Sequence, residues 1–191
     1  MTRRALFAIL ALLVIASVGV TAYVVVSRSR RRPVARAAAA ATAPAPVAAT
    51  PGRRIKAHLY YVAEDGLHLQ AVDRDVPYAD GADQAREILN AQIAPVSEPF
   101  VSAIPMGTTV RTLFVTATGD AYVDFSHELQ SSHSGGTMNE LLTVYAIVDS
   151  LTANLPAIKD VQILVDGREV ATLAGHIDLR QPLAKNLALV Q

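Results

Sequence analysis

Ser126 and its surroundings offer the chemistry of nucleophilic hydrolysis. Ser126 could act as a nucleophile beside Asp124, and a base could come from His127, His133 or His176. However, the Gly-x-Ser-x-Gly turn that exposes many serine nucleophiles does not surround Ser126. Short polar side chains after a strand commonly bond nearby main-chain groups. We therefore expect Asp124 and Ser126 to cap the turn or short helix that follows this strand.

A second candidate is metal binding by His176 and Asp178. They flank Ile177, so both side chains could point to one side of an extended segment. A metal site needs a third and a fourth ligand, yet the sequence has no His-x-x-x-His pattern and no Cys. We expect both side chains to bond main chain beside Gly175 instead.

The segment Gly135-Gly136-Thr137 precedes a long apolar pattern, and the amides of a helix start there could receive an anion. Neither a nearby Lys or Arg nor a P-loop spacing supports such a site, so we expect a loop that needs conformational freedom. The sequence thus predicts no catalytic, cofactor-binding or metal-binding residues, and we do not expect an enzyme.

Three tyrosines could form a platform for carbohydrate or peptide: Tyr60, Tyr61 and Tyr78. Adjacent strand residues point to opposite faces, so at most one of Tyr60 and Tyr61 is expected to be exposed on either side. For one of them, core packing is the better interpretation.

The elements that would position these residues follow the order β-β-α-β-β-α-β-β. This predicts an α+β fold with a mixed sheet and two helices packed on it. The second helix starts at a predicted capping box, Thr137-x-x-Glu140, in which each side chain satisfies a free backbone donor. Strands are expected at residues 58–63, 67–71, 110–116, 121–125 and 161–165, with a last strand after 167, and helices at 80–94 and 137–154.

The run DVQILVDGREVATLAGHIDLRQPL, residues 160–183, contains an Asp166-Gly167 pair that suits a type I′ hairpin turn. This run resembles the end of the GerMN domain, a module named after spore germination and sporulation proteins. The resemblance covers about residues 56–186 in a single copy, without a tandem repeat or an attached hydrolase domain. Other family-like pieces, in order, are Ile104-Pro105-x-Gly107-Thr108, Val123-Asp124-Phe125-Ser126 and Gly135-Gly136-Thr137 with the leucine-rich helix after it.

Charge and hydropathy divide the chain into four parts. We expect a basic N-terminus at 1–4, a transmembrane helix at 5–26, a basic and then Ala/Pro-rich linker at 27–54, and the domain at 55–191. The first 54 residues hold nine arginines and no acid, whereas the domain has eight basic residues against 17 acids, a formal charge of −9. An acidic domain argues against nucleic-acid binding, because phosphate attraction needs a basic surface.

Residues 5–26 carry no charge, and as a helix they would span roughly 33 Å, enough for the core of a bilayer. A cleaved signal peptide is the alternative, but its apolar region usually covers only about 7–15 residues. The arginines that begin at Arg28 also make a poor cleavage environment. We expect a single-pass anchor in the cytoplasmic membrane, and a lipoprotein anchor is excluded because Cys is absent.

Two features give opposite predictions for the side of the membrane on which the domain lies. Four arginines follow the apolar segment within six residues and only Arg3 and Arg4 precede it, so the positive-inside rule would place the domain in the cytoplasm. The GerMN resemblance implies the opposite side, and we expect the domain to be extracytoplasmic. The resemblance also implies a non-catalytic interaction or assembly domain at the cell envelope, with envelope proteins or further copies as partners. The alternatives are a peptidoglycan-binding module and a hydrolase.

Overall fold

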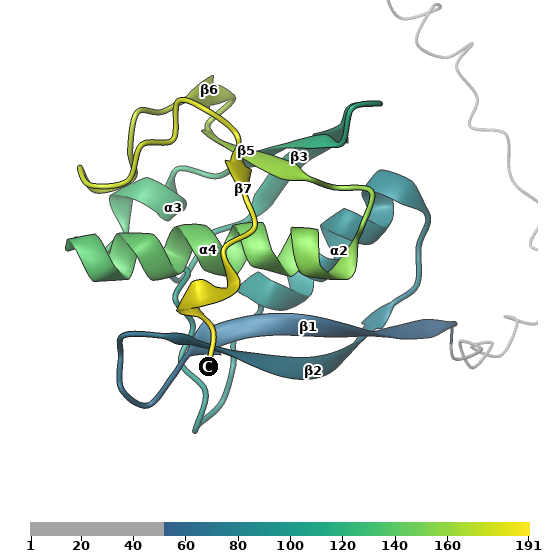
Figure 1. The fold of residues 1–191 in the computed structure, drawn as a ribbon, viewed down its shortest axis with the longest axis horizontal. Helices are drawn as coiled ribbons and strands as arrows, with labels where there is room; N and C mark the ends of the chain where they lie inside the picture. Colours follow the sequence, from purple (N-terminus) through teal and green to yellow (C-terminus); the bar gives the residue numbers. More distant parts are fainter. Residues whose placement is uncertain (1–51) are drawn as a thin grey trace, which may run out of the picture. The chain divides into compact units, whose positions relative to one another are not determined.

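The computed structural model describes residues 52–191, which form two β-sheets and a layer of helices (Figure 1). The first sheet is an antiparallel hairpin of β1 (Arg54–Val62) and β2 (Leu69–Pro77). The second sheet has the order β3-β4-β5-β6, and β7 also pairs with β5. Its strands are β3 (Val110–Val115), β4 (Asp120–Phe125), β5 (Asp160–Val165), β6 (Arg168–Glu169) and β7 (Leu183–Ala184). The helices are α2 (Gly81–Ile93), α3 (Glu128–Ser131), α4 (Thr137–Asn154) and the 3-10 helix η1 (Leu187–Leu189).

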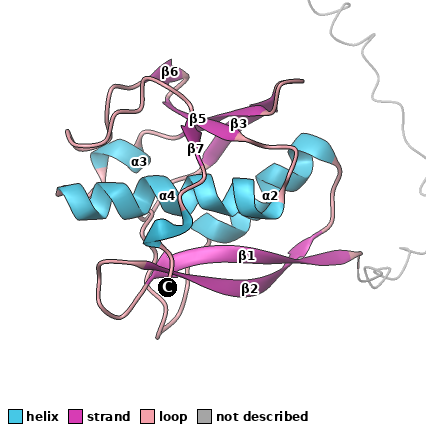
Figure 2. Ribbon diagram, in the orientation of Figure 1, coloured by secondary structure: helices cyan, strands magenta, loops and turns pink. Residues whose placement is uncertain are grey.

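The long helices α2 and α4 lie between the two sheets (Figure 2). The predicted α+β class is confirmed, and the predicted order of elements holds with α3 and β7 added. The second sheet is mixed, because β3 and β4 are antiparallel whereas β4 and β5 are parallel. The expectation of one sheet with helices packed on it is wrong, since β1 and β2 form a separate sheet on the other side of the helices.

Helix α4 is apolar on more than one side, which explains its position. Eleven of its 18 residues are buried. Val148 and Leu151 belong to the larger core cluster, together with Ile163 of β5. Leu142 instead packs in a smaller cluster with Tyr60 of β1. A helix that is apolar all round must be buried all round, so two sheets are needed to cover it.

Both tyrosines of β1 are buried, although the sequence favoured core packing for one. Tyr60 is 3% exposed and Tyr61 is 1% exposed. Leu142 of α4 packs near Tyr60, while the ring centroid of Phe100 lies 5.6 Å from that of Tyr61. Both faces of β1 are covered at this point, and of the three tyrosines that the sequence singles out Tyr78 alone is exposed.

The predicted type I′ turn is confirmed. Asp166 and Gly167 have φ angles of 51° and 73°, and the turn joins Val165 directly to its pairing partner Arg168. The strand after the turn is shorter than expected, because β6 has only two residues.

Two sequence predictions fall on residues whose structure is not described. The predicted transmembrane helix, 5–26, lies outside the described residues. Of the predicted linker, 27–54, residues 27–51 also lie outside them. Within residues 52–191, no helix combines the length and the apolar character needed to cross a membrane.

On the edge of β1 that faces away from β2, the backbone N–H and C=O groups bond side chains rather than another strand. The amide of Asn154 accepts from His58 N at 2.8 Å and donates to His58 O at 2.7 Å. The amide of Gln92 does the same for Tyr60, at 2.8 and 2.7 Å. Ser150 Oγ then donates to Gln92 Oε1 at 2.7 Å. Two side-chain amides thus replace the backbone of a missing neighbour strand.

Replacing Gln92 with Leu should destabilise the domain. The change nearly conserves volume, but it leaves the N–H and C=O of buried Tyr60 without partners. We expect a loss of about 2–4 kcal/mol in the free energy of unfolding, measured by urea denaturation. Gln70→Leu is the control, because that half-buried side chain makes one long bond of 3.4 Å and should change stability by only about 0.5 kcal/mol. Equal effects of the two changes would contradict this account of the β1 edge.

Candidate functional site

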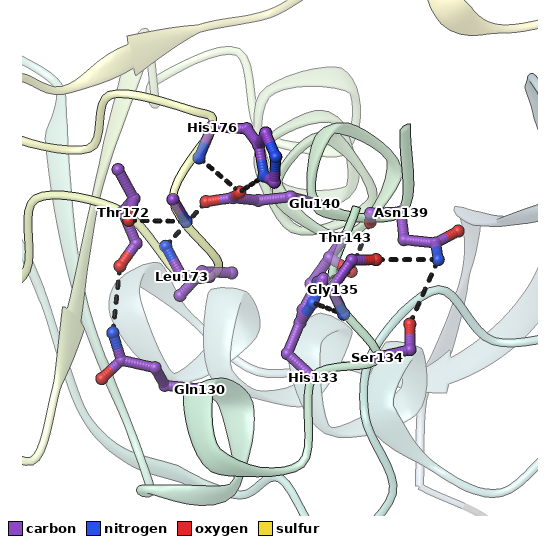
Figure 3. Close-up of polar contacts among 11 residues, drawn as sticks. Gln130, His133, Ser134, Gly135, Asn139, Glu140, Thr143, Thr172, Leu173 and His176 are labelled. Carbon is purple, nitrogen blue, oxygen red and sulfur yellow. Dashed lines mark hydrogen bonds and ion pairs between the residues drawn. The ribbon is translucent and has the colours of Figure 1, made fainter. Parts of the chain in front are cut away.

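The start of α4 brings together three of the polar side chains that the sequence singles out, His133, Glu140 and His176 (Figure 3). Gly135 and Gly136 have φ angles of 78° and 86°, a region that glycine adopts without strain. Gly136 is the N-cap residue, and no side-chain hydrogen bond caps the helix. The predicted capping box is therefore wrong. The capping box required Thr137 to be the N-cap residue, but Thr137 is the first residue of the helix itself. The side chain of Glu140 can therefore bond elsewhere.

Glu140 binds a segment that is distant in sequence. Its side chain has 0% exposure, and its carboxylate accepts from Leu173 N at 2.7 Å and from His176 N at 2.9 Å. Burial acts to raise the pKa of Glu140, but backbone N–H groups of Ala174, His176, Leu173 and Ile177 outweigh it, and the pKa is lowered. The carboxylate stays ionised with its oxygens occupied by main chain. It therefore positions the segment after β6 and is poorly placed to act as a base.

His133 is also occupied internally. Its Nδ1 accepts from Gly135 N at 2.9 Å, which assigns the proton of the neutral ring to Nε2. Nε2 lies 3.1 Å from the hydroxyl of Thr143, and that hydroxyl donates to Ala103 O at 2.6 Å. Burial lowers the pKa of His133, so the neutral form is favoured. The ring connects the loop before α4 to the helix itself.

Asp124 and Ser126 lie apart from this cluster and bond main chain. Asp124 Oδ1 accepts from Gly167 N at 2.6 Å, which fixes the turn between β5 and β6. Ser126 Oγ accepts from Thr109 N at 3.0 Å. The expectation of main-chain bonding is confirmed, but neither side chain caps α3. Among the described residues no hydrogen bond joins Ser126 to a histidine, and His127 instead lies 3.7 Å from a carboxylate oxygen of Asp166.

His176 and Asp178 do not converge on one site. His176 Nδ1 is 3.2 Å from Glu140 Oε2, whereas Asp178 accepts from the backbone and the guanidinium of Arg180. The hydrogen bonds from Arg180 lower the pKa of Asp178 to about 2. In the described part of the chain, no group of three or more His, Cys, Asp or Glu side chains could hold a metal ion.

Asp149 is a buried acid that sequence reasoning missed. Its Oδ1 accepts from Asn186 N at 2.9 Å, while Oδ2 is buried without a partner among the described residues. Burial raises the pKa of Asp149. The available signal was its position in α4, next to Val148 and two residues before Leu151. Both sides of such a helix are apolar, so an acid between these residues has no solvent face.

Residues 58–171 match the sequence profile of the Germane family, which is described as acting in sporulation and spore germination. The chain belongs to this family. The resemblance of this Germane protein to GerMN domains is thereby confirmed. No curated protein matches the chain in sequence.

Solved structures share the Germane fold at low sequence identity. The tandem GerMN domains of the sporulation protein GerM from Bacillus subtilis align with a TM-score of 0.54 and 19% identity over 69% of this chain. The chain spans 46% of that tandem structure, about half its length. A putative lipoprotein from Clostridium perfringens aligns with a TM-score of 0.50 and 20% identity, covering 69% of this chain and 88% of the other. At these identities the likeness shows the fold alone.

Replacing Glu140 with Gln should loosen the segment after β6. The amide keeps one acceptor but turns a donor toward backbone N–H groups, so we expect a loss of about 1.5–3 kcal/mol at pH 7. Because the folded-state pKa lies below the ordinary 4.5, the ionised acid stabilises the fold above that pH, and this contribution is lost as pH falls through the folded pKa. Glu140→Gln should remove that part of the acid sensitivity, measured by urea denaturation against pH.

A local measurement separates this effect from general destabilisation. Hydrogen exchange at the Leu173 and His176 amides should accelerate in Glu140→Gln more than exchange in β4. Glu169→Gln, at an exposed position, should leave exchange at both amides unchanged. Unchanged protection of Leu173 in Glu140→Gln would show that the carboxylate does not hold this segment.

Replacing Asp149 with Asn should stabilise the domain at neutral pH. The amide can still accept from Asn186 N, while no charge is buried. The folded pKa is raised above the ordinary 3.8, so the contribution of Asp149 is complete below that pH and is lost as pH rises through the folded value. The melting temperature of the variant should exceed that of the native chain at pH 7, and the gap should close near pH 3. Glu64→Gln, at an exposed position, should show no gap at either pH.

Proposed function

We propose that this Germane protein is a membrane-tethered, extracytoplasmic module that acts as a non-catalytic interaction or assembly domain at the cell envelope. Residues 5–26 form the anchor in the cytoplasmic membrane, and residues 27–54 space the domain from it. Its partners are envelope proteins or further copies of the chain, in a process related to sporulation or germination.

One observation carries the non-catalytic part of this proposal: the side chains that could act as acid, base or nucleophile form hydrogen bonds that stabilise the fold. Glu140, Asp124 and Ser126 each bind a main-chain group of another segment, and His133 binds the main chain of its own loop. Groups engaged in this way are not available to move protons on a substrate. Exposed apolar side chains remain for binding, and they include Val101, Met106 and Phe114, which are 58%, 92% and 63% exposed.

The extracytoplasmic side is supported by the family and by the name of one structural relative. A protein of similar fold is named a putative lipoprotein, and the family is described by sporulation and spore germination. This chain has no Cys for a lipid anchor, so the uncharged segment 5–26 takes that role. The arginines after residue 26 argue for the opposite orientation, which makes the side of the membrane the first point to test.

A peptidoglycan-binding role is the second candidate, and Tyr78 favours it. This ring is 39% exposed and lines a pocket of about 570 Å³. Its hydroxyl bonds the carboxylate of Asp80 at 2.5 Å. An aromatic ring beside a carboxylate suits a sugar ligand. Retention of the full chain on purified sacculi, lost in Tyr78→Ala, would favour this role over protein assembly.

A topology reporter tests the proposal directly. Alkaline phosphatase fused after Gln191 should be active in cells, because that enzyme folds to its active form only outside the cytoplasm. A fluorescent protein that matures only in the cytoplasm should stay dark at the same position. The reverse pattern would place the domain in the cytoplasm and overturn the proposal.

The non-catalytic assignment has its own test in cells that depend on the chain. Ser126→Ala and His176→Ala should retain full cellular function when the variant proteins accumulate to native levels. Loss of function in Ser126→Ala at normal abundance would instead support a hydrolase.

A further inference from the structure

Strand β3 forms one end of the second sheet and leaves backbone groups unpaired. Thr116 N donates to Asp120 O, so Phe114 and Thr112, two and four residues earlier, also bond β4. The N–H and C=O groups of Leu113 and Val115 must therefore point away from β4. Among residues 52–191, nothing donates to or accepts from these four groups, so this edge can accept another strand.

The β3 edge is irregular only before its neutral part, where the pairing with β4 shifts register between Val110 and Thr112. Natural edges carry Lys, Pro or inward charges, yet residues 112–118 contain no charge and no proline. Phe114 is 63% exposed on the outer face, opposite Tyr122 of β4. Like-charged domains repel, but a neutral edge allows two copies of an otherwise acidic domain to approach.

We infer that β3 pairs antiparallel with β3 of a second copy, with a two-fold axis at Phe114. In this register, Leu113 exchanges both backbone bonds with the partner's Val115, and Val115 does so with the partner's Leu113. Phe114 then faces the partner's Phe114 at a non-hydrogen-bonded position, where side chains are closest. The inference rests on the proposed assembly function and names the surface through which copies associate.

Arg111, which precedes the neutral stretch, is paired within its own chain. Its guanidinium lies 2.7 Å from a carboxylate oxygen of Asp166 and 3.6 Å from one of Asp124. The antiparallel direction therefore follows from the two-fold axis at Phe114 and not from charges at the ends of the strand.

Cysteine pairs test the register, because the native chain contains no Cys. Thr112 should lie opposite the partner's Thr116, at the roughly 4.5 Å Cα separation of a non-hydrogen-bonded pair, which a disulfide can span. Full-length chains with Thr112→Cys and with Thr116→Cys, coexpressed and oxidised in membranes, should form disulfide-linked dimers. Either variant alone should not, since identical positions would be about 13 Å apart along the strand.

Met106→Cys and Leu67→Cys provide collision controls, because the native side chains are 92% and 52% exposed. Each control should crosslink much less than the mixed pair. Absence of crosslinking in the mixture, or equal crosslinking by any single variant, would overturn the inference.

A second test measures dimerisation without introduced cysteines. Phe114→Lys in the full chain, solubilised in detergent, should weaken dimerisation by roughly tenfold or more in sedimentation experiments. Leu67→Lys removes a comparably exposed apolar side chain elsewhere and should leave the dimer unchanged. A monomeric native chain would also overturn the inference. If phosphatase fusions show the domain outside the cytoplasm while these dimer tests fail, the proposed function stands and only the β3 interface falls.

Discussion

The structure depends on the burial of α4 between two sheets. Because no side of this helix faces solvent along most of its length, each polar side chain on it must find a partner inside the protein. The helix meets this constraint by bonding the backbone of surrounding segments. Glu140 binds the segment after β6, Thr143 the loop before β3, Asp149 the segment after β7, and Asn154 the first strand. The core and the outer loops are therefore fixed by the same helix.

This arrangement explains why several polar side chains lie close together near the start of α4. A carboxylate, a histidine and a hydroxyl lie near the start of α4, from Glu140, His133 and Thr143. In space, their oxygens and nitrogens meet amide and carbonyl groups of the chain itself. A buried ionised group needs several such donors to offset its desolvation, and Glu140 has them. These groups hold the surrounding loops in position.

Local features of the fold were readable from sequence, whereas features that depend on distant partners were not. The Asp166-Gly167 turn is set by two adjacent residues, and the helix at 137–154 is set by its own periodicity. The fate of Glu140 was not readable, because its partners lie more than 30 residues away and a local capping box was an equally good explanation. The separation into two sheets was missed for the same reason. Strand patterns show which face is buried but not which helix covers it.

The strand edges differ in how their outer backbone groups are covered. The edge of β1 is closed by the amides of Gln92 and Asn154, and the free edge of β2 carries Asp73, Asp75 and Pro77, which discourage strand addition. The edge of β3 carries no charge and no proline over residues 112–118. A pair of domains joined through β3 has used this edge on both copies. Growth by sheet extension along this edge therefore ends at two domains, and anything larger must be built through other surfaces.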